Sequence, residues 1–117
     1  MIDYHEELVA ALDAVLSTYY ELALDSSIET PCISYMENVN YDDVTGDSLG
    51  YSRIGYKVTV HTKGNGALQA ARNYAKQVDA VMRRNGFNRI ASTELFDNES
   101  VYFRKILTYE ALASETF

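Results

Sequence analysis

The sequence predicts an α+β fold, a two-layer sandwich in which two helices cover one face of a four-stranded, mainly antiparallel sheet. Three observations carry this prediction. Apolar and polar residues alternate from Tyr51 to Thr62, which is the period of a half-buried strand. A helical spacing of apolar residues then begins near Ala67 and stops at Gly86, where a positive φ is often required. Two further strand-like runs flank a turn at residues 97–98.

The expected order of elements is α-β-β-α-β-β, and the first helix is predicted over residues 3–24. Asp3 is a candidate N-cap, and Glu6 follows three residues later in a capping-box arrangement. Helical spacing places the apolar face at Leu8, Leu12, Val15, Leu16, Tyr19 and Ala23.

A first hairpin is predicted over residues 32–62. Pro31 favours extended geometry before it, so the run Cys32 to Val39 is expected to form one strand. Residues 40–50 are polar, acidic and rich in turn formers, which predicts a loop. The strand from Tyr51 to Thr62 returns from this loop.

A second helix over residues 67–85 and a second hairpin over residues 88–109 complete the prediction. The hairpin strands are expected at 88–96 and 100–109, and the tail 113–117 is expected to fray. The predicted buried stripe of the helix is Leu68, Ala71, Ala75, Val78, Val81 and Met82. Short turns between consecutive strands favour antiparallel pairing, with both helices on one face of the sheet.

Length and composition predict one globular domain in a reducing compartment. The chain has 117 residues and 47% hydrophobic content, which argues against disorder. Cys32 is the single cysteine, so no internal disulfide can form. The acidic N-terminus does not resemble a signal peptide, and no apolar run is long enough for a membrane span. We therefore expect the protein to be made in a cytoplasm.

Charge and tyrosine content indicate the kind of partner. The formal net charge of −7 opposes specific binding of nucleic acid or anionic lipid, because Lys and Arg supply most of that affinity. Ten tyrosines and no tryptophan suit surfaces that become buried on assembly, although each single tyrosine is better explained as the rim of a small core.

No catalytic, cofactor or metal site is predicted. Gly64-Asn65-Gly66 lacks the further glycine of a dinucleotide fingerprint and the lysine of a P-loop, so a plain strand-to-helix turn is preferred. The acidic residues of 42–47 do not have the spacing of a calcium loop. Cys32 and His61 could be neighbours on the hairpin, but no orienting group or oxyanion hole accompanies them.

Two segments are candidate partner interfaces. Arg83, Arg84 and Arg89 form a basic cluster, with Arg104 and Lys105 close to it across the sheet. The cluster either caps the helix end and pairs with acids, or binds acidic groups at an oligomer interface. The second candidate is the acidic loop of residues 40–50, which carries the apolar residues Tyr41, Val44 and Leu49. Tyr51, at the start of the next predicted strand, is included with them.

Three runs of the sequence resemble tail-terminator (tail-completion) proteins, which are minor tail proteins of long-tailed bacteriophages. They are the strand 56–61, the helix exit 78–89 with its Gly-Phe-x-Arg pattern, and the closing strand 103–109. Pro31 and the extended segment 33–35 also look like the first strand of that family. The resemblance covers residues 31–111, and the loop 40–50 matches no family motif.

The resemblance implies a small subunit of a homo-oligomeric ring, commonly a hexamer. Such a ring caps the tail tube at the end nearest the head. Its partners would be other copies of itself, the major tail tube protein and the head–tail connector protein. DNA would slide through the ring without specific binding, which the negative charge suits. No enzymatic activity is expected.

Three alternatives stay open. The chain could be another head–tail joining or minor tail protein, or a bacterial adaptor that binds one partner as a monomer. It could also be a small enzyme or ligand-binding domain that uses the open face of the sheet, where Lys57, Thr59 and His61 are expected.

Overall fold

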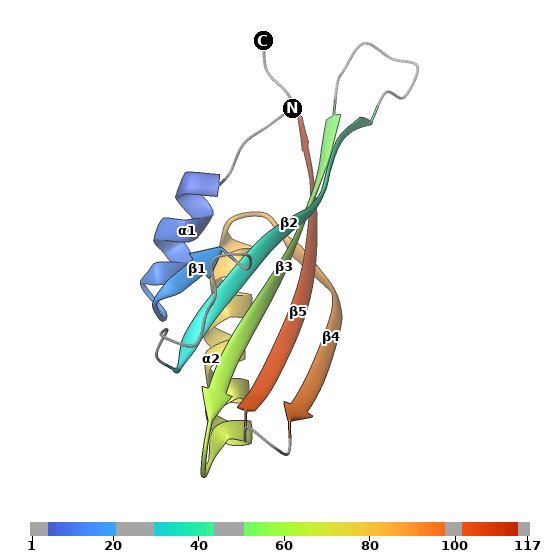
Figure 1. Ribbon diagram of the computed structural model, residues 1–117. Helices are drawn as coiled ribbons and strands as arrows, with labels where there is room; N and C mark the ends of the chain where they lie inside the picture. The colour runs from blue at the N-terminus through green and yellow to red at the C-terminus, as the bar shows by residue number, and fades with distance from the viewer. Residues whose placement is uncertain (1–4, 21–29, 44–50, 98–101, 115–117) are drawn as a thin grey trace.

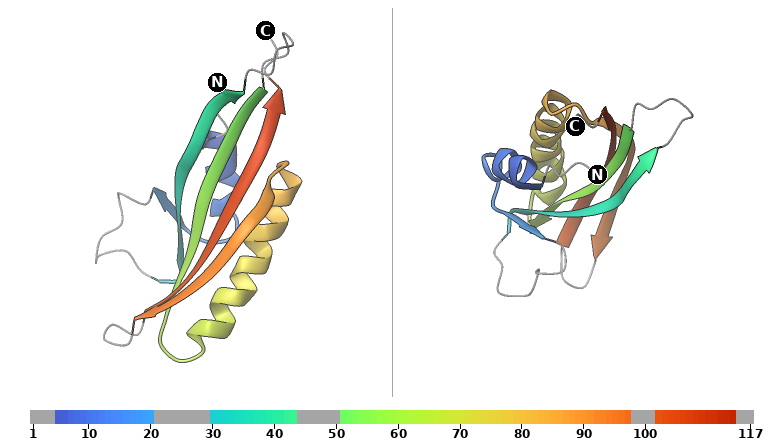
Figure 2. Two further views of the ribbon diagram at one scale, coloured as in Figure 1. Left: turned by 90° about the vertical axis from the view of Figure 1, so that its right-hand side faces the viewer. Right: turned by 90° about the horizontal axis from the view of Figure 1, so that it is seen from above.

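The computed structural model describes residues 5–20, 30–43, 51–97 and 102–114, which form two helices and one sheet (Figure 1). The elements in chain order are α1 (His5–Asp13), β1 (Thr18–Tyr20), β2 (Cys32–Asp43), β3 (Tyr51–Lys63), α2 (Ala67–Arg84), β4 (Asn88–Asp97) and β5 (Tyr102–Ser114). Both helices lie on the same face of the sheet (Figure 2). The molecule is therefore an α+β two-layer sandwich.

The sheet has five strands in the order β1-β2-β3-β5-β4 and is mixed, whereas four mainly antiparallel strands were predicted. β2, β3, β5 and β4 pair antiparallel, but β1 pairs parallel with β2 through Thr18 opposite Ile33 and Tyr20 opposite Tyr35. β1 was missed because its three residues lie inside a longer stretch with helical spacing.

The first helix is much shorter than the predicted 3–24. Helix α1 ends at Asp13, whose side-chain Oδ1 accepts a hydrogen bond of 3.1 Å from the Thr18 backbone N–H. The Thr18 hydroxyl donates to the Leu16 carbonyl at 2.9 Å. These bonds stabilise a turn, and the β-branched and aromatic residues after it favour extended structure. Of the predicted apolar face, Leu8 and Leu12 lie in α1 and are buried, and Val15, Leu16 and Tyr19 follow it and are partly buried. The candidate cap Asp3 and the face residue Ala23 lie outside the described residues.

The β2–β3 hairpin extends further than predicted. β2 continues to Asp43, past the predicted end at Val39, and the segment 40–43 pairs with 51–54 of β3. The register shifts between Glu37 and Val39, so a bulge interrupts the ladder at the point where the sequence suggested that the strand would stop. Residues 44–50, the remainder of the predicted loop, lie outside the described residues.

The core lies between the sheet and the two helices. The alternation in β3 has the predicted sense, with Ile54, Tyr56, Val58 and Val60 all at most 2% exposed on the helix-covered face. Leu107 and Tyr109 of β5 lie beside them in register. Burial of these side chains removes apolar surface from water and so stabilises the fold.

Helix α2 starts at the predicted Ala67 and ends at Arg84, one residue before the predicted end. Its buried residues are Ala67, Ala71, Ala75, Val78, Val81 and Met82. Leu68 was predicted in this stripe, but it is 43% exposed, and Ala67 takes the buried position. Three alanines at a spacing of four let the first half of the helix pack closely on the sheet.

Gly86 ends α2 in a Schellman motif. Its φ is +87°, its N–H donates to the Arg83 carbonyl at 3.1 Å, and the Phe87 N–H donates to the Met82 carbonyl at 3.0 Å. Phe87 and Met82 are both buried, which is the apolar contact that accompanies this motif.

Substitution of Gly86 by Ala should destabilise the protein by about 1 kcal/mol, because an L-residue strains at this φ. An added Cβ would meet no atom within 4 Å, so the cost should be conformational and not steric. Gly86→Asn is the matched control, since Asn tolerates left-handed geometry better. Urea unfolding followed by circular dichroism measures both. Equal losses for Ala and Asn would contradict the explanation.

The second hairpin also extends past its predicted end. β5 continues to Ser114, and Ala113 and Ser114 pair with Ser52 and Tyr51 of β3, although this part of the tail was expected to fray. β4 stops pairing with β5 at Glu110. β2, β3 and β5 therefore extend as a three-stranded ribbon beyond β4 and α2 (Figure 2, left). This ribbon explains the elongated dimensions of 53 × 23 × 22 Å.

Candidate partner interface

A basic groove of about 290 Å³ lies between α2 and the edge of the sheet formed by β5 and β4. Its lining residues are Arg72, Ala75, Lys76, Asp79, Arg89 and Lys105. Four of these six side chains are cationic. They come from one face of α2 and from the helix-facing side of β4 and β5, where side chains of alternate strand residues meet the helix.

Asp79 organises one end of the groove. Its carboxylate accepts hydrogen bonds from Arg83 Nε at 2.7 Å and from the Tyr109 hydroxyl at 3.0 Å, and it lies 3.7 Å from Arg89 Nη1. Partial burial raises the pKa of the Asp79 carboxyl, but the bonds from Arg83 and Tyr109 and the two nearby guanidinium charges outweigh it. The net effect is a lowered pKa. Burial and the same carboxylate raise the pKa of Tyr109 well above its usual value.

Glu94 of β4 organises the other end. Arg72 donates to it at 2.9 and 3.1 Å through Nε and Nη2, and Lys105 donates at 3.1 Å through Nζ. These hydrogen bonds, that of Arg72 foremost, lower the pKa of Glu94 to about 2. The ion pairs tie α2 to β4 and β5 at the solvent surface, where each pair contributes little to stability but helps fix the geometry.

The Asp79 cluster should make stability depend on pH. The lowered pKa of Asp79 means that its contribution is fully present above the pKa of an unfolded aspartate, near 4, and is lost as pH falls through the folded value. Asp79→Asn should therefore reduce stability at pH 7 and flatten the decline between about pH 5 and pH 2. Urea titrations at pH 7, 5 and 3 measure this. A variant that loses stability as steeply as the wild type on acidification would contradict the assignment.

The structure brings together part of the predicted basic cluster. Arg83 and Arg89 meet at Asp79, and Lys105 lines the same groove. Arg84 is exposed and, like Lys76, forms no ion pair within the described part of the chain. Arg104 was expected near the cluster, but it lies opposite His61 and Leu95, on the other face of the sheet from Lys105. Strand alternation separates these two neighbours.

The second predicted interface is described only in part. Tyr41 belongs to β2 and pairs through its backbone with Arg53, so it is a strand residue and not the loop residue that was predicted. Tyr51 opens β3 opposite Asp43. Val44 and Leu49 lie outside the described residues.

Sequence reasoning missed two features in and beside the basic groove. The first is Asp79, although its i,i+4 spacing to Arg83 is a recognisable ion-pair signal. The second is a set of exposed apolar side chains on β4, namely Ile90, Leu95 and Phe96, which are 56%, 48% and 55% exposed. Leu95 and Phe96 are consecutive, so they project from opposite faces of the strand, and one-sided burial cannot cover both.

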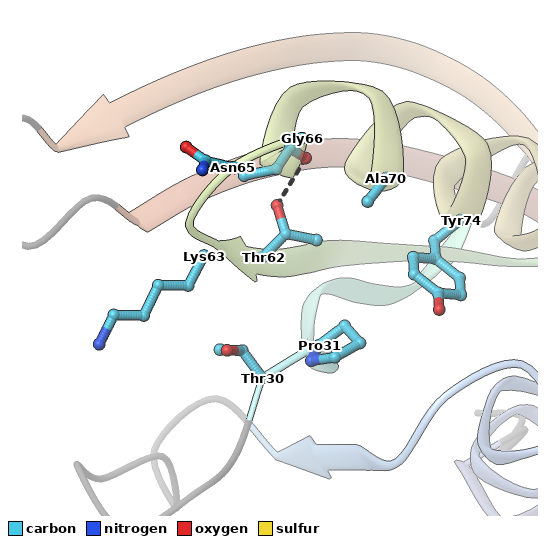
Figure 3. Close-up of a pocket in the computed structure, with 9 residues that line it drawn as sticks. Thr30, Pro31, Thr62, Lys63, Asn65, Gly66, Ala70 and Tyr74 are labelled. Carbon is cyan, nitrogen blue, oxygen red and sulfur yellow. Dashed lines mark hydrogen bonds between the residues drawn. The ribbon is translucent and has the colours of Figure 1, made fainter.

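The strand-to-helix turn at residues 64–66 borders a smaller pocket of about 150 Å³ (Figure 3). Gly64 and Gly66 both have positive φ, and the Thr62 hydroxyl donates to the Ala67 carbonyl at 2.8 Å. Figure 3 shows the Lys63 side chain extending away from the helix start, and its Nζ lies 5.2 Å from the centre of the Tyr102 ring. The geometry is that of a tight strand-to-helix turn, and the ammonium group of the neighbouring Lys63 contacts the Tyr102 ring.

The Cys32–His61 pair predicted from the hairpin does form cross-strand neighbours. His61 Nε2, however, shares a hydrogen bond of 2.8 Å with the Ser34 hydroxyl, and Ser34 is only 1% exposed. Burial raises the pKa of the Cys32 thiol, which disfavours the nucleophilic thiolate. Neither the thiol nor the Ser34 hydroxyl is presented to a substrate.

Among solved structures, the fold is similar to that of a chain in the virion of a native gene transfer agent particle. The TM-score is 0.57 at 14% sequence identity, and the match covers 92% of this chain and 84% of that one. At this identity the similarity shows a shared fold. No protein-family profile and no curated protein matches the sequence.

Within the described residues, no cluster of His, Cys, Asp and Glu side chains has the geometry to hold a metal ion. None of the helices in these segments is long and apolar enough to cross a membrane.

Proposed function

We propose that this protein is a structural component of a virion, and specifically a ring-forming tail terminator that caps the tail tube and joins it to the head connector. The observation that carries the proposal is the shared fold over 92% of the chain with a chain of the gene transfer agent virion. The resemblance of the strand 56–61, the helix exit and the closing strand to tail-terminator proteins supports the finer assignment.

The surface described above suits assembly better than catalysis. β4 is an edge strand of ten residues whose described side chains are all exposed, and unprotected edges readily pair with another chain. Among the described residues of the open sheet face, Thr59 and Ser34 are buried, and His61 bonds to Ser34. We therefore propose no enzymatic activity and no specific binding of DNA.

Disruption of the gene in the phage or prophage that encodes this chain tests the proposal. We expect unjoined heads and tails, with tails of irregular length if the chain stops tube growth, and rescue by the wild-type protein supplied from a plasmid. Electron microscopy of the particles provides the readout. A particle structure with this chain absent from the head-proximal end of the tail would overturn the terminator role, and complete absence from the particle would overturn the virion role.

The same experiment separates the alternative of another head–tail joining or minor tail protein. Loss of such a protein would leave tails of normal length that fail to join heads, or would alter a different part of the tail. Tail length measured on many particles therefore discriminates a terminator from a joining protein.

A further inference from the structure

The charge of this chain is divided between its two halves. Residues 1–52 contain 11 Asp and Glu residues and no Lys or Arg, a formal charge of −11. Residues 53–117 contain all 10 Lys and Arg residues and six acidic residues, a formal charge of +4. The net charge of −7 therefore conceals two halves of opposite sign.

The fold separates these halves across the strands of the sheet. The acidic half supplies β1 and β2 at one edge, with α1 beside them, and the basic half supplies β5 and β4 at the other edge (Figures 1 and 2). Helix α2 of the basic half packs over β3 and β5, on the same face as α1. The boundary runs along β3, the central strand. The formal charge of the subunit therefore changes from negative to positive across the strands, from β1 to β4.

Side chains on both sides are available to a partner. On the acidic flank, defined here by α1, β1 and β2, the exposed acids are Glu6, Glu7, Asp13 and Glu37. On the basic flank, defined by α2 and β4, the exposed cations are Arg72, Lys76, Arg83, Arg84 and Arg89. Asp79 and Glu94 neutralise part of the basic flank, but Lys76 and Arg84 form no ion pair within the described chain.

The basic flank also carries the apolar surface that a stable contact needs. The exposed residues Ile90, Leu95 and Phe96 follow the outer strand β4, beside the basic groove. On the acidic flank, Tyr20 of β1 is 42% exposed and packs edge-on against Tyr35 at 5.5 Å. Apolar residues surrounded by charges are the usual composition of a specific interface.

We propose that the acidic flank of one copy docks on the basic flank of a second copy, with the exposed edge of β4 at the centre of the contact. The occupant is a second copy because the complementary charge and the apolar surface belong to the same chain. The contact is head-to-tail, so each subunit uses two different surfaces, and repetition closes a ring or continues as a filament. This inference rests on the proposed self-assembly and adds which surfaces meet.

The test is a charge exchange in the purified full-length chain. One variant reverses the acidic flank with Glu6→Lys and Glu7→Lys, and the other reverses the basic flank with Lys76→Glu and Arg84→Glu. Lys76 and Arg84 form no hydrogen bond or ion pair in the described structure, so the basic-flank variant should fold. Glu6 and Glu7 lie in the first turn of α1, where their reversal costs about 0.3–1 kcal/mol each, so circular dichroism must first show that the acidic-flank variant is folded. Sedimentation velocity at low salt and at about 0.5 M salt measures association, since salt screens such charges.

Each variant alone should associate about ten- to a hundredfold more weakly than wild type, because each then brings like charges together. An equimolar mixture should recover wild-type association. In an alternating assembly, the reversed flank of one variant meets the oppositely charged reversed flank of the other, and the two unchanged flanks also meet with opposite charge. The control Lys57→Glu with Lys63→Glu changes the net charge as much as the basic-flank variant. Both residues lie on the open-face side of the central strand β3, away from β4, so this control should associate as wild type does.

Several outcomes would overturn the inference. The first is a mixture that associates as weakly as the single variants, and the second is a control that associates as weakly as the basic-flank variant. The other two concern the wild-type chain, which would either stop at a dimer or remain monomeric at low salt and about 0.5 mM. The proposed virion role is tested on particles and would survive each of them. Conversely, absence of the chain from the particle would leave the contact measured on the purified protein unchanged.

Discussion

Replacement of Tyr109 by Ala is expected to destabilise the protein by about 4 kcal/mol. Tyr109 has no exposed surface, lies opposite Tyr56 of β3 and Arg89 of β4, and its hydroxyl donates a hydrogen bond to Asp79 of α2. The substitution would leave a cavity between three elements and remove a hydrogen bond to a partly buried carboxylate. A loss of this size is a large share of the 5–15 kcal/mol typical of a domain.

Tyr109→Phe separates the two contributions. It keeps the aromatic ring and removes only the hydroxyl, so the expected loss is about 1–2 kcal/mol. Tyr20→Ala, at a position 42% exposed, is the surface control and should change stability by less than about 1 kcal/mol. Urea unfolding at pH 7 gives all three values. Equal losses for Phe and Ala would mean that the bond to Asp79, and not the packing, dominates at this site.

Ala71→Leu is expected to destabilise the protein by about 3 kcal/mol through overpacking. Ala71 is fully buried at the middle of the alanine row by which α2 approaches the sheet, beside Ala67 and Ala75. Three added carbon atoms cannot be accommodated unless the helix moves away from β3 and β5. That movement would also disturb the pairing of Arg72 with Glu94.

The matched control is Ala80→Leu in the same helix, where the side chain is exposed. Leu and Ala differ little in helix propensity, so this variant should stay within about 0.5 kcal/mol of wild type. Thermal unfolding followed by circular dichroism compares the two. If Ala71→Leu were as stable as Ala80→Leu, the close approach of α2 to the sheet would not be a constraint on the fold.

The basic groove was only partly predictable from sequence. Arg83 and Arg89 could be recognised as a cluster, and the acid at position 79 could have been added from helical spacing. Lys105 was expected close to the cluster, and it lines the groove. The meeting of Glu94 with Arg72 and Lys105 could not be predicted, because it depends on the register of β4 against β5. The bulge between Arg89 and Ala91 shifts that register by one residue, and the residue types at these positions do not predict a bulge.

Two elements were determined by the sequence itself. Strand β3 alternates without interruption, and α2 has a complete apolar stripe and a Gly86 stop, so local propensity, period and capping all agree. Where such signals coincide, the tertiary structure has no competing conformation to select. The α+β class followed from these two elements and the second hairpin.

The backbone conformation of residues 13–20 and 40–43 was determined only by the tertiary structure. Leu12, Leu16 and Tyr19 are spaced for a helix, yet Asp13 and Thr18 form a turn, and the outer edge of β2 offers unpaired backbone groups that β1 satisfies. Likewise, polar residues 40–43 remain extended because β3 already pairs with β5 along its full length and provides a template for them. In both segments, hydrogen bonding to a strand distant in sequence outweighs the local preference, and such pairing is invisible in a single sequence.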